Sequence, residues 1–183
     1  ADVYAFAELE NSASATINDL LVAVNARCGG AHPFLFADTG GTVGTDAIRV
    51  AIVYRKGILK PFGTPLIDTN AIHSRPPTAV IFDVVDSANP ARGERFTVVA
   101  NHFKSKGCRD ASGADADHND NQGCWNATRV TSAQQLHAWL QTDPTGTGAR
   151  DAVLLGDFNA YAMEDPIRTL RDRALEGETL KAH

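Results

Sequence analysis

The chain has 183 residues, of which 43% are hydrophobic, and a formal net charge of −5 at pH 7. This composition is typical of a globular protein with a sizeable core, and no apolar run approaches the ~20 residues that span a bilayer. The negative charge argues against a protein that holds nucleic acid mainly through a basic surface. It does not exclude an enzyme acting on nucleic acid, because a bound divalent cation supplies positive charge locally. The first residues lack the pattern of a signal peptide, and we expect any export signal to have been lost before Ala1.

The first half of the chain contains one helix pattern and four strand patterns. Apolar residues recur at helical spacing from Ile17 to Val24, after capping residues at 11–14, and Gly29 stops the pattern. The strands expected in this half lie at 3–9, 34–36, 47–54 and 78–85.

The second half adds two strands and two helices. A strand at 96–100 follows the preceding one through a turn-rich segment, which predicts an antiparallel hairpin. Residues 128–141 predict a helix with one apolar face. The apolar strand at 152–155 runs straight into the segment GDFNA at 156–160, and Pro166 stands near the first turn of a last helix. The chain shows no internal repeat and no interdomain linker, so we expect one α/β unit with mixed strand pairing.

Two of the three cysteines flank a polar loop. Cys108 and Cys124 enclose a segment rich in Asp, Asn and Gly, which cannot bury enough apolar surface to order itself. A disulfide between them would stabilise the fold by roughly 3 kcal/mol, because it reduces the conformational entropy of the unfolded chain. It would also favour an oxidising compartment. The alternative is two free thiols in a cytosolic loop. For Cys28 we expect a partly buried thiol.

Polar groups follow three of the expected strands, where folding alone gives no reason for them. Glu8 closes one strand, His102 follows a second, and Asp157 and Asn159 follow a third. Groups just past the carboxyl ends of strands gather in one crevice in α/β sheets, and paired carboxylates suit a hard cation. Each residue alone has an ordinary explanation as an exposed strand end, a structural histidine or a turn former. Together they predict a site for phosphate ester chemistry.

Four segments add a family resemblance to this pattern. They are AELEN at 7–11, GTDAIRVAIVYR at 44–55, NHFKSKGC at 101–108 and GDFNAYAMEDPI at 156–167. These segments resemble the endonuclease/exonuclease/phosphatase family, which includes deoxyribonuclease I and the abasic-site endonucleases, and within it the bacterial extracellular nucleases. The resemblance spans nearly the whole chain. It implies a four-layer α/β/β/α sandwich, with residues 1–183 as a single, partial domain.

Residue by residue, the resemblance implies the following roles. Glu8 resembles the family's metal-binding glutamate. His102 resembles its first active-site histidine, which assists at the scissile phosphate as an acid or hydrogen-bond donor. Asp157 resembles the aspartate that orients the attacking water or its base, and Asn159 the amide that steadies the phosphate oxygens. Arg75 is similar to an arginine that contacts the substrate phosphate, which suits a planar guanidinium.

Two further residues and a cofactor complete the expected site. Asp46 is the candidate acid that orients His102, since a carboxylate can fix the tautomer of an imidazole. Lys104 is a candidate contact for the phosphate backbone, with a solvated lysine as the alternative. The resemblance implies a divalent cation as cofactor, Mg²⁺ first, with Ca²⁺ and Mn²⁺ as alternatives.

The chain also departs from the family at both ends. Members have an N-terminal strand with an asparagine near the metal, and a C-terminal Ser-Asp-His motif whose histidine commonly serves as general base. No such strand precedes Ala1, and His183 does not stand in such a motif. We therefore expect a sandwich truncated at both ends, and we assign His183 no role.

These features predict a divalent-metal-dependent phosphodiesterase that hydrolyses the nucleic-acid backbone. We expect a secreted or periplasmic bacterial endonuclease of DNA or RNA that acts as a monomer and does not bind membranes. Two alternatives stay open. The same chemistry could serve a phospholipid or a small phosphate ester, although the chain has only two tryptophans and no aromatic hairpin. The chain could also be a catalytically incomplete fragment that acts only as a binding module.

Overall fold

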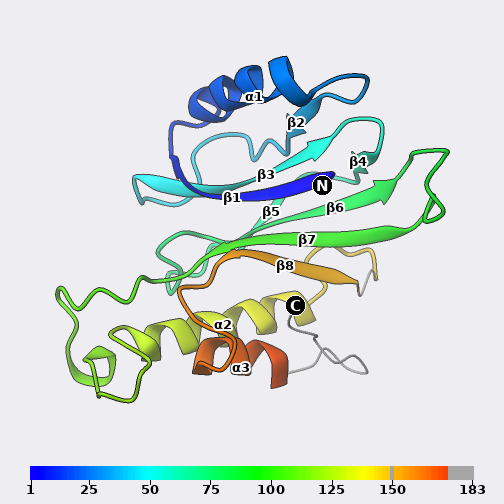
Figure 1. Cartoon of the computed structure of the whole chain (residues 1–183). Helices are drawn as coiled ribbons and strands as arrows, with labels where there is room; N and C mark the ends of the chain where they lie inside the picture. Colours follow the sequence, from blue (N-terminus) through cyan, green and yellow to red (C-terminus); the bar gives the residue numbers. More distant parts are fainter. Residues whose placement is uncertain (149–150, 173–183) are drawn as a thin grey trace.

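The computed structural model describes residues 1–148 and 151–172 (Figure 1). Its elements in chain order are β1 (Val3–Glu10), α1 (Ala15–Cys28), β2 (Phe34–Phe36), β3 (Ile48–Arg55), β4 (Leu59–Pro61), β5 (Leu66–Ile67), β6 (Thr78–Val84), β7 (Arg95–His102), the 3-10 helix η1 (Gly113–Asp115), α2 (Asn126–Gln141), β8 (Ala152–Asp157) and α3 (Asp165–Asp172). Neither β4 nor β5 was predicted from the sequence, because strands of two or three residues are too short to show a periodic pattern. None of the described helices has the length and apolar character needed to cross a bilayer.

The first sheet is antiparallel, with β3 between β1 and β2, and α1 lies on its outer face (Figure 1). Side chains alternate along β3. Ala51 and Val53 pack into a cluster with Leu21 of α1, whereas Ile52 belongs to the cluster on the opposite face. Because both faces are covered, the strand is an almost uninterrupted apolar run in the sequence.

The second sheet has the order β4–β6–β7–β8, with β5 also paired to β6. β6 and β7 form the expected antiparallel hairpin, in which Thr78 pairs with Ala100. β8 runs parallel to β7, so the strand pairing is mixed, as predicted. Parallel pairing brings the carboxyl ends of β7 and β8 to the same edge of the sheet, which is where ligand-binding groups collect in α/β proteins.

The two sheets pack face to face and helices cover both outer faces (Figure 1). Ile52 of the first sheet and Phe82 of the second belong to the core between them. On the far side of the second sheet, Leu136 of α2 and Leu170 of α3 pack over Val99. The layers are therefore α1, the first sheet, the second sheet, and α2 with α3. This order confirms the predicted α/β/β/α sandwich.

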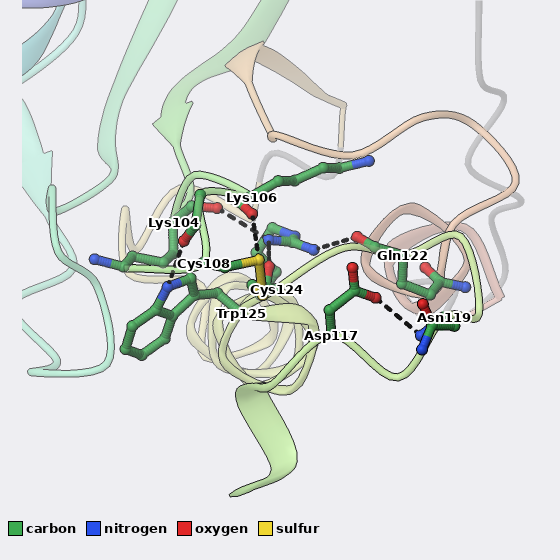
Figure 2. Close-up of a disulfide and its surroundings, with 10 residues drawn as sticks. Lys104, Lys106, Cys108, Asp117, Asn119, Gln122, Cys124 and Trp125 are labelled. Carbon is green, nitrogen blue, oxygen red and sulfur yellow. Dashed lines mark hydrogen bonds between the residues drawn. A yellow bond between two sulfur atoms is a disulfide. The ribbon is translucent and has the colours of Figure 1, made fainter. Parts of the chain in front are cut away.

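The polar loop after β7 is closed by the expected disulfide between Cys108 and Cys124 (Figure 2). Beside it, the fully buried Arg129 donates a hydrogen bond to the Cys124 main-chain oxygen at 2.7 Å. Asp115 accepts hydrogen bonds from the main-chain N–H and the hydroxyl of Thr128, at 2.8 and 2.7 Å, and so caps the first turn of α2. The loop is thus ordered by a covalent bond and polar anchors, in place of a core of its own.

Cys28 differs from expectation, since its thiol is exposed. The residue continues the apolar stripe of α1, which is why the sequence favours burial. At this end of the helix, however, the stripe passes over an open cavity of about 220 Å³ between α1 and the first sheet, lined also by Tyr4 and Val24. The thiol lines this opening and is not enclosed.

Candidate active site

The candidate site lies where β7 and β8 end together. His102 is paired with Asp157 across the two strands, and His102 Nε2 lies 4.0 Å from Asp157 Oδ2. The strands approach this closely because residue 156 is glycine. Its φ is +120°, and a Cβ atom there would lie 2.9 Å from the main-chain nitrogen of Asn101 and closer still to its carbonyl oxygen. The glycine of GDFNA is therefore required by the neighbouring strand, and it allows His102 and Asp157 to lie side by side.

The main-chain oxygen of Phe103 joins two of the resembling segments, 101–108 and 156–167, to Arg75. It accepts hydrogen bonds from Asn159 Nδ2 at 3.0 Å and from Arg75 Nη1 at 3.3 Å. Asn159 has a positive φ of 48°, and its own N–H donates to Asp157 Oδ1 at 2.8 Å, which is the turn that aspartate side chains favour. One carbonyl next to His102 therefore places a guanidinium and an amide beside the imidazole. No sequence pattern indicates a main-chain acceptor of this kind.

Asp46 contacts Arg75 in the structure. Its Oδ2 lies 3.2 Å from Arg75 Nε, and the described interactions of Asp46 include no direct bond to His102, which it was expected to orient. The loop that carries Asp46 is held by Asn11, whose Oδ1 accepts from the Val43 N–H at 2.9 Å and whose Nδ2 donates to the Asp46 main-chain oxygen at 3.0 Å. The sequence suggested Asn11 only as a helix cap; its place in the segment AELEN was the available signal.

Glu8 reaches the site through an irregularity in β1. The pairing with β3 shifts between Phe6 and Leu9, and Glu8 has a positive φ of 58°. Phe6 and Leu9 are three residues apart, yet both pack toward α1, which a regular strand with its two-residue period does not allow. A β-bulge of this kind re-aims a side chain. Here it leaves the Glu8 side chain exposed while its apolar neighbours stay packed.

Four charged residues surround His102. Burial has the largest influence and lowers the pKa of His102, and the positive charge of Arg75 lowers it further. The negative charges of Asp157, Glu8 and Asp46 act in the opposite direction on the same pKa. His102 Nδ1 is buried and has no hydrogen-bond partner in the described part of the chain. The structure therefore brings Glu8, Asp46, Arg75 and Asp157 together around one buried imidazole, which is neutral at pH 7.

The acidic side chains of the site suit Mg²⁺ but not Zn²⁺. Within residues 1–148 and 151–172, no three His, Cys, Asp or Glu side chains cluster closely enough to enclose a metal. Zn²⁺ takes three or four protein ligands, so these residues do not fit it. Mg²⁺ binds through one or two carboxylates and completes its shell with water and substrate phosphate oxygens. The exposed carboxylate of Glu8, beside a group of residues suited to phosphate, fits an ion of this second kind.

Two other polar residues near the site have structural contacts. Lys104 Nζ lies 4.6 Å from the centroid of the Trp125 ring, and Lys104 is not among the charges that shift the pKa of His102. Asn101 is fully buried and donates from Nδ2 to the Val99 and Leu155 main-chain oxygens, so it links β7 to β8. His183 lies outside the described residues.

Comparisons with known proteins bear on the fold. No family model matches the sequence, and neither does any curated protein. The chain is similar to the solved structure of an endonuclease/exonuclease/phosphatase family protein from Bacteroides thetaiotaomicron, with 16% identity over 94% of this chain and 54% of that chain, and a TM-score of 0.55. A second similar structure is a humanized D. rerio TDP2 with 14 mutations, with 16% identity over 89% of this chain and 51% of that chain, and a TM-score of 0.45. A third is a truncated Caenorhabditis elegans TDP2, with 12% identity over 89% of this chain and 51% of that chain, and a TM-score of 0.49.

The chain spans about half the length of these solved structures. The likeness to the Bacteroides protein agrees with the four observed layers and with the predicted resemblance. The chain therefore has the α/β/β/α fold of an endonuclease/exonuclease/phosphatase protein.

Proposed function

We propose that this chain carries part of the active site of a divalent-metal-dependent phosphodiesterase that hydrolyses the backbone of DNA or RNA. The observation that supports this best is the group around His102. A buried imidazole next to a carboxylate at the ends of two parallel strands, with an arginine and a second carboxylate in reach, is suited to a phosphodiester.

Each residue has a separate task in this proposal. The neutral ring of His102 donates a hydrogen bond to a phosphate oxygen and stabilises the charge that develops there. Asp157 accepts a proton or hydrogen bond from the attacking water. Arg75 and Asn159 bind the remaining phosphate oxygens, and both are pre-positioned by the Phe103 carbonyl. Because these groups are fixed before substrate binds, little reorganisation is needed in the transition state.

Asp46 supports this arrangement through Arg75. Their contact at 3.2 Å restricts the rotation of the guanidinium and leaves its terminal nitrogens directed to Phe103 and to the proposed phosphate. A phosphate at this position faces mixed charge, since Glu8, Asp46 and Asp157 are all acidic. A Mg²⁺ ion bound at Glu8 would neutralise phosphate charge there, with Ca²⁺ or Mn²⁺ as alternative ions. This explains how a chain of net charge −5 can act on a polyanion.

The disulfide supports a location outside the cytosol. Disulfides persist in the periplasm and in secreted proteins and are rare in the reducing cytosol. The bond between Cys108 and Cys124 anchors the segment that directly follows His102. We therefore propose a secreted or periplasmic nuclease, which we expect to act as a monomer.

Plasmid nicking tests this function. Supercoiled DNA is incubated with the chain in Mg²⁺, Mn²⁺ or Ca²⁺, and in parallel with a chelator. We expect conversion to open circles that the chelator abolishes. His102→Ala should reduce the rate by about 10²–10⁴-fold, the usual contribution of a positioned hydrogen-bonding or proton-transferring group. The matched control is His118→Ala, because His118 is exposed in the disulfide loop.

Two outcomes would count against the proposal. If no divalent ion supports nicking, the chain does not hydrolyse DNA and acts as a binding module at most. If His102→Ala and His118→Ala nick at the same rate, activity does not depend on the site described above.

A further inference from the structure

The segment that connects β8 to α3, residues 158–164, exposes two large apolar side chains. Tyr161 is 78% exposed and Met163 is 73% exposed, the highest values among the large apolar residues described. The segment begins at the candidate site. Since consecutive Cα atoms are 3.8 Å apart, the Cα of Tyr161 lies at most about 8 Å from that of Asn159. An exposed aromatic ring thus lies on the segment that directly follows the residues proposed to bind phosphate.

The backbone of Tyr161 is held in place by Glu164. The buried carboxylate of Glu164 accepts a hydrogen bond from the Tyr161 N–H at 3.1 Å, and the Glu164 N–H donates to the Tyr161 main-chain oxygen at 2.9 Å. The next residue, Asp165, accepts from Asn126 Nδ2 at 3.0 Å and so ties the segment to α2. The ring is therefore exposed on a fixed turn, and binding a ligand there requires little ordering of the loop.

A lysine lies over one face of the ring. Lys106 Nζ is 4.6 Å from the centroid of Tyr161 and forms an ion pair with Glu164. Figure 2 shows the side chains of Lys104 and Lys106 leaving their segment in opposite directions, with Lys104 toward Trp125. Only Lys106 is therefore directed to the segment that follows Asp157. The ring has a cation on one face and remains open to solvent elsewhere.

We propose that Tyr161 is a stacking platform for an unpaired base next to the scissile phosphate, and that it gives the enzyme a preference for single-stranded nucleic acid. The inference rests on the proposed function, since it names the substrate class of the same site. Aromatic rings beside a phosphate-binding group are the usual means by which proteins hold single strands without reading their sequence.

The ring selects single strands for a steric reason. In a duplex the face of each base is covered by its neighbours, so a protein ring can stack only after the base leaves the helix, which costs a few kcal/mol. An unpaired strand carries no such cost. Met163 is equally exposed on the same segment but has no ring, so it serves as the matched control.

Binding measurements separate this inference from the question of catalysis. Fluorescence anisotropy would give the affinity for a labelled single-stranded oligonucleotide in Mg²⁺, with phosphorothioate linkages that slow cleavage. A second oligonucleotide of the same length would carry abasic sites throughout its centre. The variants are Tyr161→Ala, Tyr161→Phe and Met163→Ala. We expect Tyr161→Ala to weaken binding of the base-bearing strand by about 5- to 100-fold, the usual range for one lost stack. Tyr161→Phe and Met163→Ala should change it less than twofold.

The abasic strand tests whether the loss of affinity in Tyr161→Ala comes from stacking on a base. Tyr161→Ala should bind it as the unmodified chain does, since no base is present to stack. The inference is overturned if Tyr161→Ala loses less than twofold on the base-bearing strand, if it loses equally on both strands, or if Met163→Ala loses as much. An equal loss on a duplex would overturn the preference for single strands. A chain that fails to nick plasmid DNA but shows the expected binding differences would disprove the proposed hydrolysis and leave the stacking site standing.

Discussion

Replacing Gly156 by alanine should destabilise the protein through a close approach to the neighbouring strand and through a strained backbone conformation. A Cβ atom at this position would lie 2.9 Å from the Asn101 nitrogen and would overlap its carbonyl oxygen, whereas carbon and oxygen normally stay about 3.3–3.6 Å apart. The obstacle is a main chain in the middle of the second sheet, so no side-chain rotation relieves it. β7 and β8 must instead separate, which weakens the pairing of His102 with Asp157.

Two costs add at this position. Overpacking a close contact costs about 1–3 kcal/mol, and holding alanine at a φ of +120° costs about 1–3 kcal/mol more. The expected loss is therefore about 2–6 kcal/mol out of a typical total of about 5–15. Gly63→Ala is the matched control. Gly63 also has a positive φ, +74°, but no heavy atom lies within 4 Å of a Cβ placed there, so only the backbone cost of about 1–2 kcal/mol applies.

Urea unfolding followed by tryptophan fluorescence measures both variants, with linear extrapolation to water. Gly156→Ala should lose at least about 1 kcal/mol more than Gly63→Ala. Its nicking activity should fall as well, because the strands that carry the site have moved apart. If both variants lose the same stability, the close approach of β7 and β8 does not constrain residue 156.

Three other predictions concern the site, the disulfide and pH. Arg75→Lys should lower kcat/KM for an oligonucleotide by about 10- to 100-fold, because a single ammonium cannot contact a carboxylate and a main-chain oxygen at once as the planar guanidinium does. Retention of the full rate would show that positive charge alone suffices. Cys108→Ser should lower the free energy of unfolding by about 3 kcal/mol. Reductant should have the same effect on the unmodified chain and none on the variant. An unchanged urea midpoint in Cys108→Ser would contradict this prediction. His73 is buried against Asp68, which also accepts a hydrogen bond from Gln135. Burial lowers the pKa of His73, and the Asp68 charge only partly offsets this. Because the folded pKa is below the unfolded value of about 6.5, the contribution of His73 to stability is fully present above that value and is lost as the pH falls. The thermal midpoint should therefore drop between pH 7.5 and 5.5 by less in His73→Asn than in the unmodified chain. Identical drops would show that protonation of His73 does not cause the loss of stability.

The larger elements and many of the residues of the site could be predicted from local residue patterns. Apolar residues at a period of two or 3.6 are a local property, so β3, α1 and α2 could be predicted from their own residues. GDFNA indicated a strand followed by a turn, and Asp157 does accept the hydrogen bond from the Asn159 N–H that such a turn makes. The polar segment between Cys108 and Cys124 indicated the disulfide that the structure contains.

Which of these residues lie next to one another depends on long-range packing. The parallel register of β7 and β8 pairs His102 with Asp157 across more than fifty residues of chain, and no local pattern encodes a register between distant strands. The same holds for the Phe103 carbonyl, because every residue has a main-chain oxygen and only packing selects one as the acceptor for Arg75 and Asn159. The bulge at Glu8 was also beyond prediction, since it depends on Phe6 and Leu9 both packing beneath α1. The sequence therefore supplied the chemical groups, and the packing of two sheets arranged them around one imidazole, because long-range contacts form where buried surfaces fit.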